Sequence, residues 1–330
     1  MLPKSYIHIF APEPRMEFSS FHLYLPAASS TDNHDYYVEY RFLYEHNPIV
    51  PDLKYNEGPN NPANRDFYRI CQAFVVKKDG DVFHPVFRAL QRGEIGFALR
   101  EKGAGDLVGG YHGDETLLDV KLMIDGKKLT LNREYFASFE TCSFYEQSYI
   151  YRCNTPETKL MLHTQNYCVD GTTLRLDQEI RWLTDAFPLQ NVFMPMLTAQ
   201  RINPDHLEQI LTDTVEFYAP DGSFVAGYDT TPYGIKGNDN VVGDDTISVC
   251  EGTFATAAKV YGKKSGFCAE AGYRVLDQSI PDEQIATHLC IRFMPHALDN
   301  KIYFSIGAGI QPKAGTIWKS NVYYRISYNP

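Results

Sequence analysis

The stretch from Gly93 to Glu115, which reads GEIGFALREKGAGDLVGGYHGDE, holds the side chains best suited to chemistry. It ends with Tyr111 and His112, followed by Asp114 and Glu115. A carboxylate beside a histidine orients the imidazole and raises its pKa toward neutral. We therefore expect Tyr111, His112 and Glu115 to form an acid-base cluster and Asp114 to contact substrate. The alternative is a tight turn whose two carboxylates cap backbone N–H groups.

A further catalytic candidate is His163, on the expected strand from Lys159 to Val169. A hairpin through Asp170-Gly171 would place His163 opposite Glu179 on the next strand, which also carries Arg181. Glu179 and Arg181 are therefore expected to bind substrate. The alternative is a hydrogen-bonded surface histidine that faces a solvated charged strand.

Basic and phenolic side chains complete the expected site. Arg100 and Lys102 follow the strand before the glycine turn, and Arg201 has the forked geometry that binds a carboxylate. A plain surface ion pair is the alternative for Arg201. A row of phenols at alternate positions favours a sugar-binding platform or sheet packing; it consists of Tyr145, Tyr149 and Tyr151.

Several familiar chemistries lack their motifs. The sequence has no G-x-S-x-G elbow, phosphate-binding loop, H-E-x-x-H or dinucleotide fingerprint. Its seven cysteines are an odd number without a C-x-x-C pair, which indicates reduced thiols. We expect no cofactor and no metal, with a structural calcium ion in the loop around Asp239, Asn240, Asp244 and Asp245 as the minor alternative.

Alternation of apolar and polar residues predicts the strands that must position these groups. Tyr36 to Tyr44 is one such strand, with Glu39, Arg41 and Glu45 on its other face. The strand from Leu118 to Ile124 enters an Asp125-Gly126 turn, a strong hairpin signal. Helical signals are confined to two short segments, after Asn203-Pro204 as far as Leu211 and from Ser279 to Ala286.

The composition is that of a folded chain. Of its 330 residues, 44% are hydrophobic and 22% charged, and no apolar run is long enough to span a bilayer. The net charge of −10 argues against nucleic acid or anionic membrane as a partner. No signal peptide precedes the first strand, so a cytoplasmic location is expected unless a leader was removed.

These patterns predict an all-β protein, a large antiparallel β-sandwich with one or two short connecting helices. Strand spacing is similar throughout, so residues 1–330 are expected to form a single domain. The N-terminal strands, within residues 1–90, would extend its sheets.

A basic strand edge, a glycine turn, the YHGDE hairpin and long strands ending in Met194-Pro195-Met196 follow one another in this order. This arrangement resembles the galactose-mutarotase-like β-supersandwich proteins, which include sugar epimerases and the sandwich domains of polysaccharide lyases. The resemblance covers residues 90 to 330 in architecture and is most specific from Gly109 to Glu115. It implies a supersandwich fold and proton transfer at a sugar.

The sequence thus predicts a carbohydrate-active enzyme that eliminates at a uronic acid or epimerises a sugar. One alternative is a glycan-binding or structural sandwich without catalysis. Another is a hydrolase in which Glu115 pairs with Glu179 or Asp177. The expected partner is a carbohydrate, and a homo-oligomer is left open.

Overall fold

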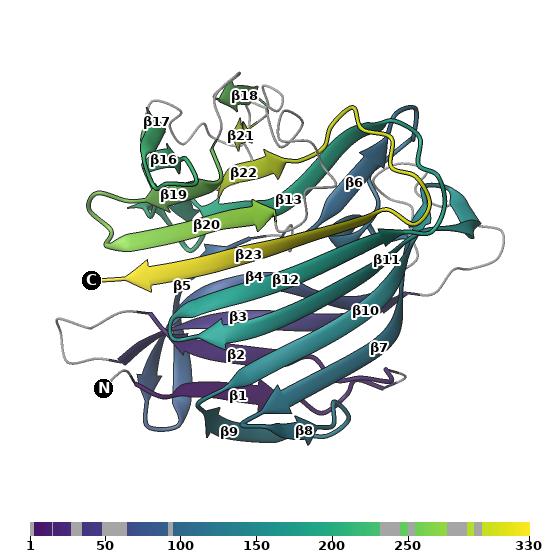
Figure 1. The fold of residues 1–330 in the computed structure, drawn as a ribbon. Helices are drawn as coiled ribbons and strands as arrows, with labels where there is room; N and C mark the ends of the chain where they lie inside the picture. Colours follow the sequence, from purple (N-terminus) through teal and green to yellow (C-terminus); the bar gives the residue numbers. More distant parts are fainter. Residues whose placement is uncertain are drawn as a thin grey trace.

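The computed structural model describes residues 3–14, 16–27, 35–47, 65–91, 95–231, 245–249, 255–275, 289–293 and 299–330. Two layers of strands lie face to face over these ranges (Figure 1). The all-β sandwich predicted from the sequence is therefore confirmed. Its described helical content is one 3-10 turn, η1 (Gly110–His112).

Long strands form the front layer in Figure 1. In order of pairing they are β8 (Lys127–Leu129), β7 (Glu115–Ile124), β10 (Cys142–Arg152), β11 (Thr155–Asp170), β12 (Thr173–Trp182), β23 (Ile317–Tyr328), β20 (Phe267–Val275), β19 (Ala257–Tyr261), β16 (Thr214–Tyr218) and β17 (Phe224–Asp229). The pairings are antiparallel, as a chain of hairpins requires.

The rear layer contains the N-terminal strands. In order of pairing it consists of β9 (Tyr135–Phe139), β1 (Ser5–Ile9), β2 (Phe21–Pro26), β3 (Asp35–Asn47), β4 (Arg65–Asp79), β5 (Val82–Leu90), β13 (Leu189–Gln200), β22 (Asp299–Ser305), β21 (Leu289–Phe293) and β18 (Asp245–Val249). A short strand, β6 (Ala98–Glu101), also pairs with β13. The layers meet where β4 runs parallel to β7, with Arg65 opposite Glu115.

The alternation of apolar and polar residues determines which side chains of a strand face the core. On β3, Val38, Tyr40, Phe42 and Tyr44 point into the core and the residues between them point outward, as predicted. The expected hairpins also form. Asp125 and Gly126 take positive φ between β7 and β8, and β11 turns into β12 with Asp170 opposite Thr173.

The helix expected after Asn203-Pro204 is wrong. This segment is a two-stranded hairpin of β14 (Ile202–Asn203) and β15 (His206–Ile210). The Asn203 side chain accepts the N–H of Asp205 at 3.1 Å and donates to Gln209 at 2.7 Å, so it stabilises a turn instead of starting a helix. The second expected helix, from Ser279 to Ala286, lies outside the described residues.

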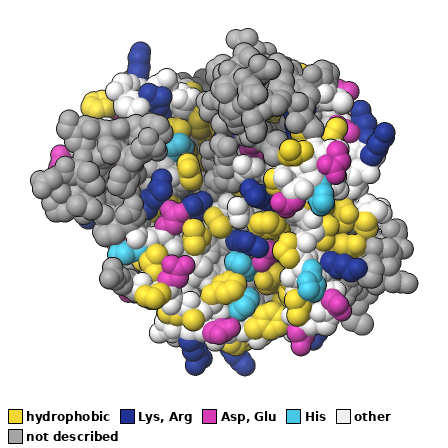
Figure 2. All heavy atoms as spheres, turned by 180° about the vertical axis from the view of Figure 1, so that it is seen from behind, with side chains coloured by type: hydrophobic (Ala, Val, Ile, Leu, Met, Phe, Trp, Pro, Cys, Tyr) yellow, Lys and Arg dark blue, Asp and Glu magenta, His cyan; other side chains and the backbone are white. Residues whose placement is uncertain are grey.

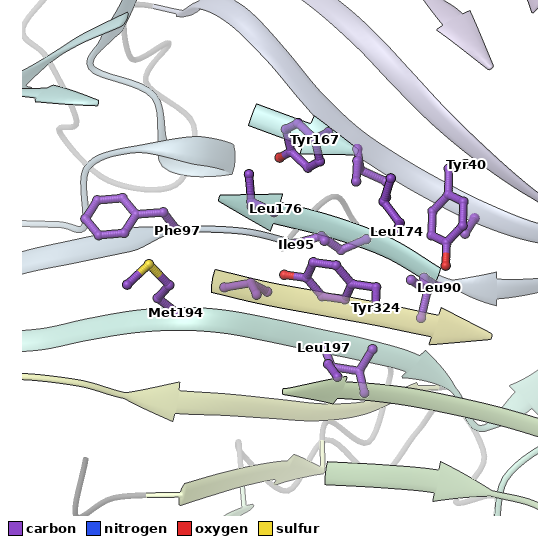
Figure 3. Close-up of a cluster of buried hydrophobic side chains, with 14 of the residues drawn as sticks. Tyr40, Leu90, Ile95, Phe97, Tyr167, Leu174, Leu176, Met194, Leu197 and Tyr324 are labelled. Atoms are coloured by element: carbon purple, nitrogen blue, oxygen red, sulfur yellow. The ribbon is translucent and has the colours of Figure 1, made fainter. Parts of the chain in front are cut away.

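Aromatic and aliphatic side chains fill the space between the layers. Figure 3 shows Tyr40, Tyr167 and Tyr324 among leucines, Ile95, Phe97 and Met194. Trp182 and Trp318 meet edge to face, with ring centroids 5.4 Å apart. Tyr36 is half-buried, whereas Tyr40, Phe42, Phe97, Trp182 and Trp318 are buried.

The described part of the chain contains no helix with the length and apolarity needed to cross a membrane.

Candidate functional site

Residues 109–115, here called the glycine motif, contain several backbone φ angles that are positive. Gly109, Gly110, Gly113 and Asp114 have φ of 85°, 53°, 76° and 54°, in the region that favours glycine. A Cβ on Gly110 would lie 2.6 Å from the carbonyl oxygen of Phe97, so any larger residue would displace the turn. The motif thus forms a compact turn that leaves the Tyr111 side chain 39% exposed.

Beneath this turn, Glu115 organises a buried polar cluster. One carboxylate oxygen accepts the N–H of Gly110 at 3.0 Å, and the other accepts the Ser148 hydroxyl and lies 3.4 Å from Nδ1 of His163. Glu115 and His163 are 1% and 2% exposed, and the His163 ring packs on Phe97. This pair therefore holds the turn from inside, out of contact with solvent.

A second buried carboxyl, Glu146, lies beside this cluster. It accepts the backbone N–H of Tyr68 at 2.7 Å across the two layers. Burial and the nearby charge of Glu115 raise the pKa of Glu146 well above its usual value. Glu146 therefore keeps its proton to a higher pH than an exposed glutamate does.

The expected meeting of His163 and Glu179 is wrong. In the pairing of β11 with β12, His163 lies opposite Ile180, and Glu179 lies opposite Thr164. Because neighbouring residues on a strand face opposite ways, Glu179 points outward. There it is 3.3 Å from each of Arg181 and Lys319.

The remaining expected residues are spread over several places. His112 lies 3.9 Å from Asp106 at the turn, and buried Asp114 accepts the Tyr151 N–H through its backbone oxygen. Arg100 donates to the carbonyl oxygen of Ala104 in its own loop, next to exposed Lys102.

Two further expectations concern the outer surface. Arg201 donates to the carbonyl oxygen of Thr230 at 2.8 Å, which occupies part of its fork. On the front layer, Lys121 lies 4.9 Å from the ring of Tyr145, and Lys159 lies 3.9 Å from the ring of Tyr149. These lysines cover ring faces that a sugar platform would need.

The outer face of the rear layer holds a cluster that the sequence analysis did not assign. Glu39, 5% exposed, is at its centre. Nδ1 of His22 lies 2.7 Å from one carboxylate oxygen, to which the Tyr24 hydroxyl donates at 3.1 Å, and Arg41 donates to the other at 2.8 Å. The register explains the meeting, since Tyr24 pairs with Glu39 and His22 with Arg41.

Burial and the neighbouring charges have opposing effects on the pKa of each of two residues in this cluster, His22 and Glu39. Burial lowers the pKa of His22, and this outweighs the opposite effect of Glu39. Burial alone would raise the pKa of Glu39, but the hydrogen bonds from His22 and Arg41 bring it below its usual value. At neutral pH, the cluster therefore combines a neutral imidazole with an ionised carboxylate that orients it.

A pocket of about 660 Å³ adjoins this cluster and includes His22 in its wall. Aromatic, aliphatic and charged groups line it; its lining consists of Phe10, Ala11, Glu13, Met16, Phe18, Ser20, His22, Leu43, Tyr44, Glu45, His46 and Arg65. Figure 2 shows the rear of the molecule, where histidine, basic and acidic side chains lie among hydrophobic ones. Such a mixture suits a ligand with both apolar and polar surfaces.

The tyrosine of the glycine motif lies beside Arg65, a residue of the pocket wall. The guanidinium carbons of Arg65 and Arg69 each lie 5.4 Å from the centroid of the Tyr111 ring. Both arginines face Glu45, which Arg69 binds through Nε at 2.7 Å and Arg65 approaches to 3.8 Å. Tyr111 is thus the member of the expected cluster that lies close to the pocket-lining residues Arg65 and Glu45.

Within the described ranges, no three His, Cys, Asp or Glu side chains are grouped in a way that could hold a metal ion. The calcium loop considered from the sequence lies outside those ranges, apart from the backbone of Asp245.

Comparisons with known proteins give structural neighbours only. No family model and no curated protein matches the sequence. Thirty-six solved chains match the structure. They include an α-galactosidase from Geobacillus stearothermophilus in complex with stachyose, with a TM-score of 0.42 and 9% identity over 93% of this chain and 41% of that chain.

Two other matches are epimerase-like. A putative aldose 1-epimerase from Klebsiella pneumoniae has a TM-score of 0.40 and 10% identity, with 91% of this chain and 85% of that chain covered. An aldose epimerase homologue from C. elegans has a TM-score of 0.37 and 10% identity, with 94% and 100% covered. Aldose epimerase-like proteins are thus among the structural neighbours, as the sequence resemblance predicted. This chain spans less than half of the α-galactosidase.

Proposed function

We propose that the rear-face pocket binds a carbohydrate and that His22, with Glu39 beside it, transfers a proton at the bound sugar. The observation that carries this proposal is the 2.7 Å contact between Nδ1 of a pocket-lining histidine and a buried carboxylate. The charge of Glu39 beside Nδ1 favours a proton on that nitrogen, which leaves Nε2 as the candidate base. No hydrogen bond through Nε2 occurs within the described residues.

The other groups that proton transfer needs are close by. His46 lines the same pocket and is held by Asp66 at 3.4 Å, so it is the candidate acid. Arg65 supplies positive charge for a developing oxyanion. The rings of Phe10 and Phe18 offer apolar faces on which a sugar can stack.

Two reactions fit these groups. Mutarotation or epimerisation needs a base and an acid on opposite sides of the sugar, and elimination at a uronic acid needs a base and a positive group at the carboxylate. An acidic sugar is compatible with this site in spite of the acidic composition of the whole chain, because Arg65 lines the pocket. Non-catalytic glycan binding is the alternative, and it would use the same pocket.

A panel of aldoses and uronic-acid oligosaccharides tests this proposal. Polarimetry would detect mutarotation, NMR would detect epimerised products, and ultraviolet absorbance would detect the unsaturated products of elimination. We expect turnover with one class of sugar and its loss in His22→Gln. Binding without turnover would support the non-catalytic alternative, and the absence of both binding and turnover across the panel would refute a carbohydrate function.

A further inference from the structure

Two guanidinium groups share one carboxylate at the end of the pocket nearest η1. Arg69 engages Glu45 through Nε and Nη2, while the nearest approach of Arg65 to Glu45 is 3.8 Å, too long for a hydrogen bond. Nε of Arg65 is buried and has no hydrogen-bond partner in the described part of the chain. Glu45 therefore does not complete the hydrogen bonding of Arg65.

Two other acids lie in this region, one engaged by other side chains and one exposed. Asp66, the next residue on β4, accepts the Tyr44 hydroxyl at 2.8 Å and lies 3.4 Å from His46. Glu13 lines the pocket but is exposed, so water screens its charge. Glu45 therefore brings one negative charge to the two positive charges of Arg65 and Arg69, while Asp66 is engaged by Tyr44 and His46.

Tyr111 supports the arginine at this end of the pocket. Its ring lies 5.4 Å from the guanidinium carbon of each arginine, within the range of a cation–π contact. The compact glycine turn around η1 sets the position of this ring. Arg65 is therefore held between an aromatic ring and Glu45 and lines the pocket.

We infer that Arg65 binds the carboxylate of an acidic sugar, so that the ligand of the pocket is a uronic acid or an oligosaccharide that contains one. This inference rests on the proposed carbohydrate pocket. A planar carboxylate matches the guanidinium fork in a bidentate pair, which a neutral hydroxymethyl group cannot do. Tyr111 gives the glycine motif a role as a positioning element, because it supports the arginine side chain.

The experiment compares two methyl galactosides that differ in one group. The methyl glycoside of galacturonic acid carries a carboxylate where that of galactose carries a hydroxymethyl group, and neither can mutarotate, so binding is measured apart from turnover. By calorimetry we expect the uronate to bind at least tenfold more tightly. This ratio should fall to within about twofold in Arg65→Gln.

The matched control is Arg175→Gln. Arg175 is an exposed arginine of the front layer paired with Asp170, and its variant should keep the wild-type ratio. The Tyr111→Leu variant should reduce the ratio without abolishing it. A methyl galactoside 6-sulfate provides the remaining arm, and tighter binding of the sulfate than of the uronate would overturn the carboxylate assignment.

The outcomes separate this inference from the proposed function. Equal binding of the two methyl galactosides, or an unchanged ratio in Arg65→Gln, would overturn the acidic-sugar inference and leave a neutral-sugar pocket standing. Failure of every sugar to bind would overturn both. Loss of turnover in His22→Gln with the uronate preference retained would support both and show that the two ends of the pocket act separately.

Discussion

The Glu146→Gln substitution should stabilise the protein, and increasingly so as the pH rises. Glu146 is completely buried and its pKa is raised by burial and by the charge of Glu115. The folded protein therefore keeps a proton that the unfolded chain releases above the ordinary glutamate value of 4.5. Because unfolding then releases a proton, rising pH favours the unfolded state of the wild type.

The size of this effect follows from the linkage of one proton. Between the unfolded and folded pKa values of Glu146, the wild type loses up to about 1.4 kcal/mol of unfolding free energy per pH unit relative to the variant. For 330 residues, with an unfolding entropy of about 2.1 cal/mol/K per residue, this corresponds to about 2 °C in melting temperature per pH unit. Glutamine keeps the bond from Tyr68, because its carbonyl oxygen can accept the N–H at the same place.

The assay is urea denaturation of both proteins at several pH values from 5 to 8. The difference in unfolding free energy should be small near pH 5 and grow with rising pH until the folded-state pKa of Glu146 is reached. Glu179→Gln is the control, since this carboxylate lies on the outer face with Arg181 and Lys319 beside it. The difference in unfolding free energy between this variant and the wild type should stay constant over the same pH range. A constant difference between wild type and Glu146→Gln over this range would refute the reasoning.

Three further substitutions test other parts of the structure. Gly110→Ala should cost about 1–3 kcal/mol of unfolding free energy, because its Cβ meets a backbone carbonyl, whereas Gly80→Ala, at a φ of +58° with open space around it, should cost less; thermal melting compares the two. Glu101→Ala should cost about 3–5 kcal/mol in urea titrations, since it leaves the largely buried Arg152 without its carboxylate partner; a loss below 1 kcal/mol would contradict this. Tyr149→Ala should leave sugar affinity within about twofold by calorimetry, because this ring lies on the front layer under a lysine, and a larger loss would move the binding site to that layer.

Period-two patterns predicted most of the fold. The inward and outward faces of β3, the Asp125-Gly126 hairpin and the turn from β11 to β12 all follow from local alternation and turn residues. The segment after Asn203 was predicted wrongly because Asn and Pro also begin turns, and here the Asn side chain bonds within the turn.

The site was harder to predict because it depends on which strands pair. Glu39 and Arg41 were recognised as the outer face of a strand, but His22 joins them only through the register of β2 with β3. Likewise, the glycine motif has the residue types of an acid-base cluster, yet its backbone turns Glu115 inward and Tyr111 outward. No local pattern predicts that the guanidinium groups of Arg65 and Arg69, on another strand, lie over the ring of Tyr111.

The most direct test of the proposed proton transfer is the pH dependence of sugar turnover in wild type and in His22→Gln. The account predicts that kcat/KM of the wild type falls on the acid side with a midpoint below 6.5, the ordinary histidine value, because burial lowers the pKa of His22. It also predicts that His22→Gln lowers kcat by about 10²- to 10⁴-fold and removes this acid limb. Turnover within about threefold of wild type, with the acid limb retained, would contradict the assignment of His22 as the base.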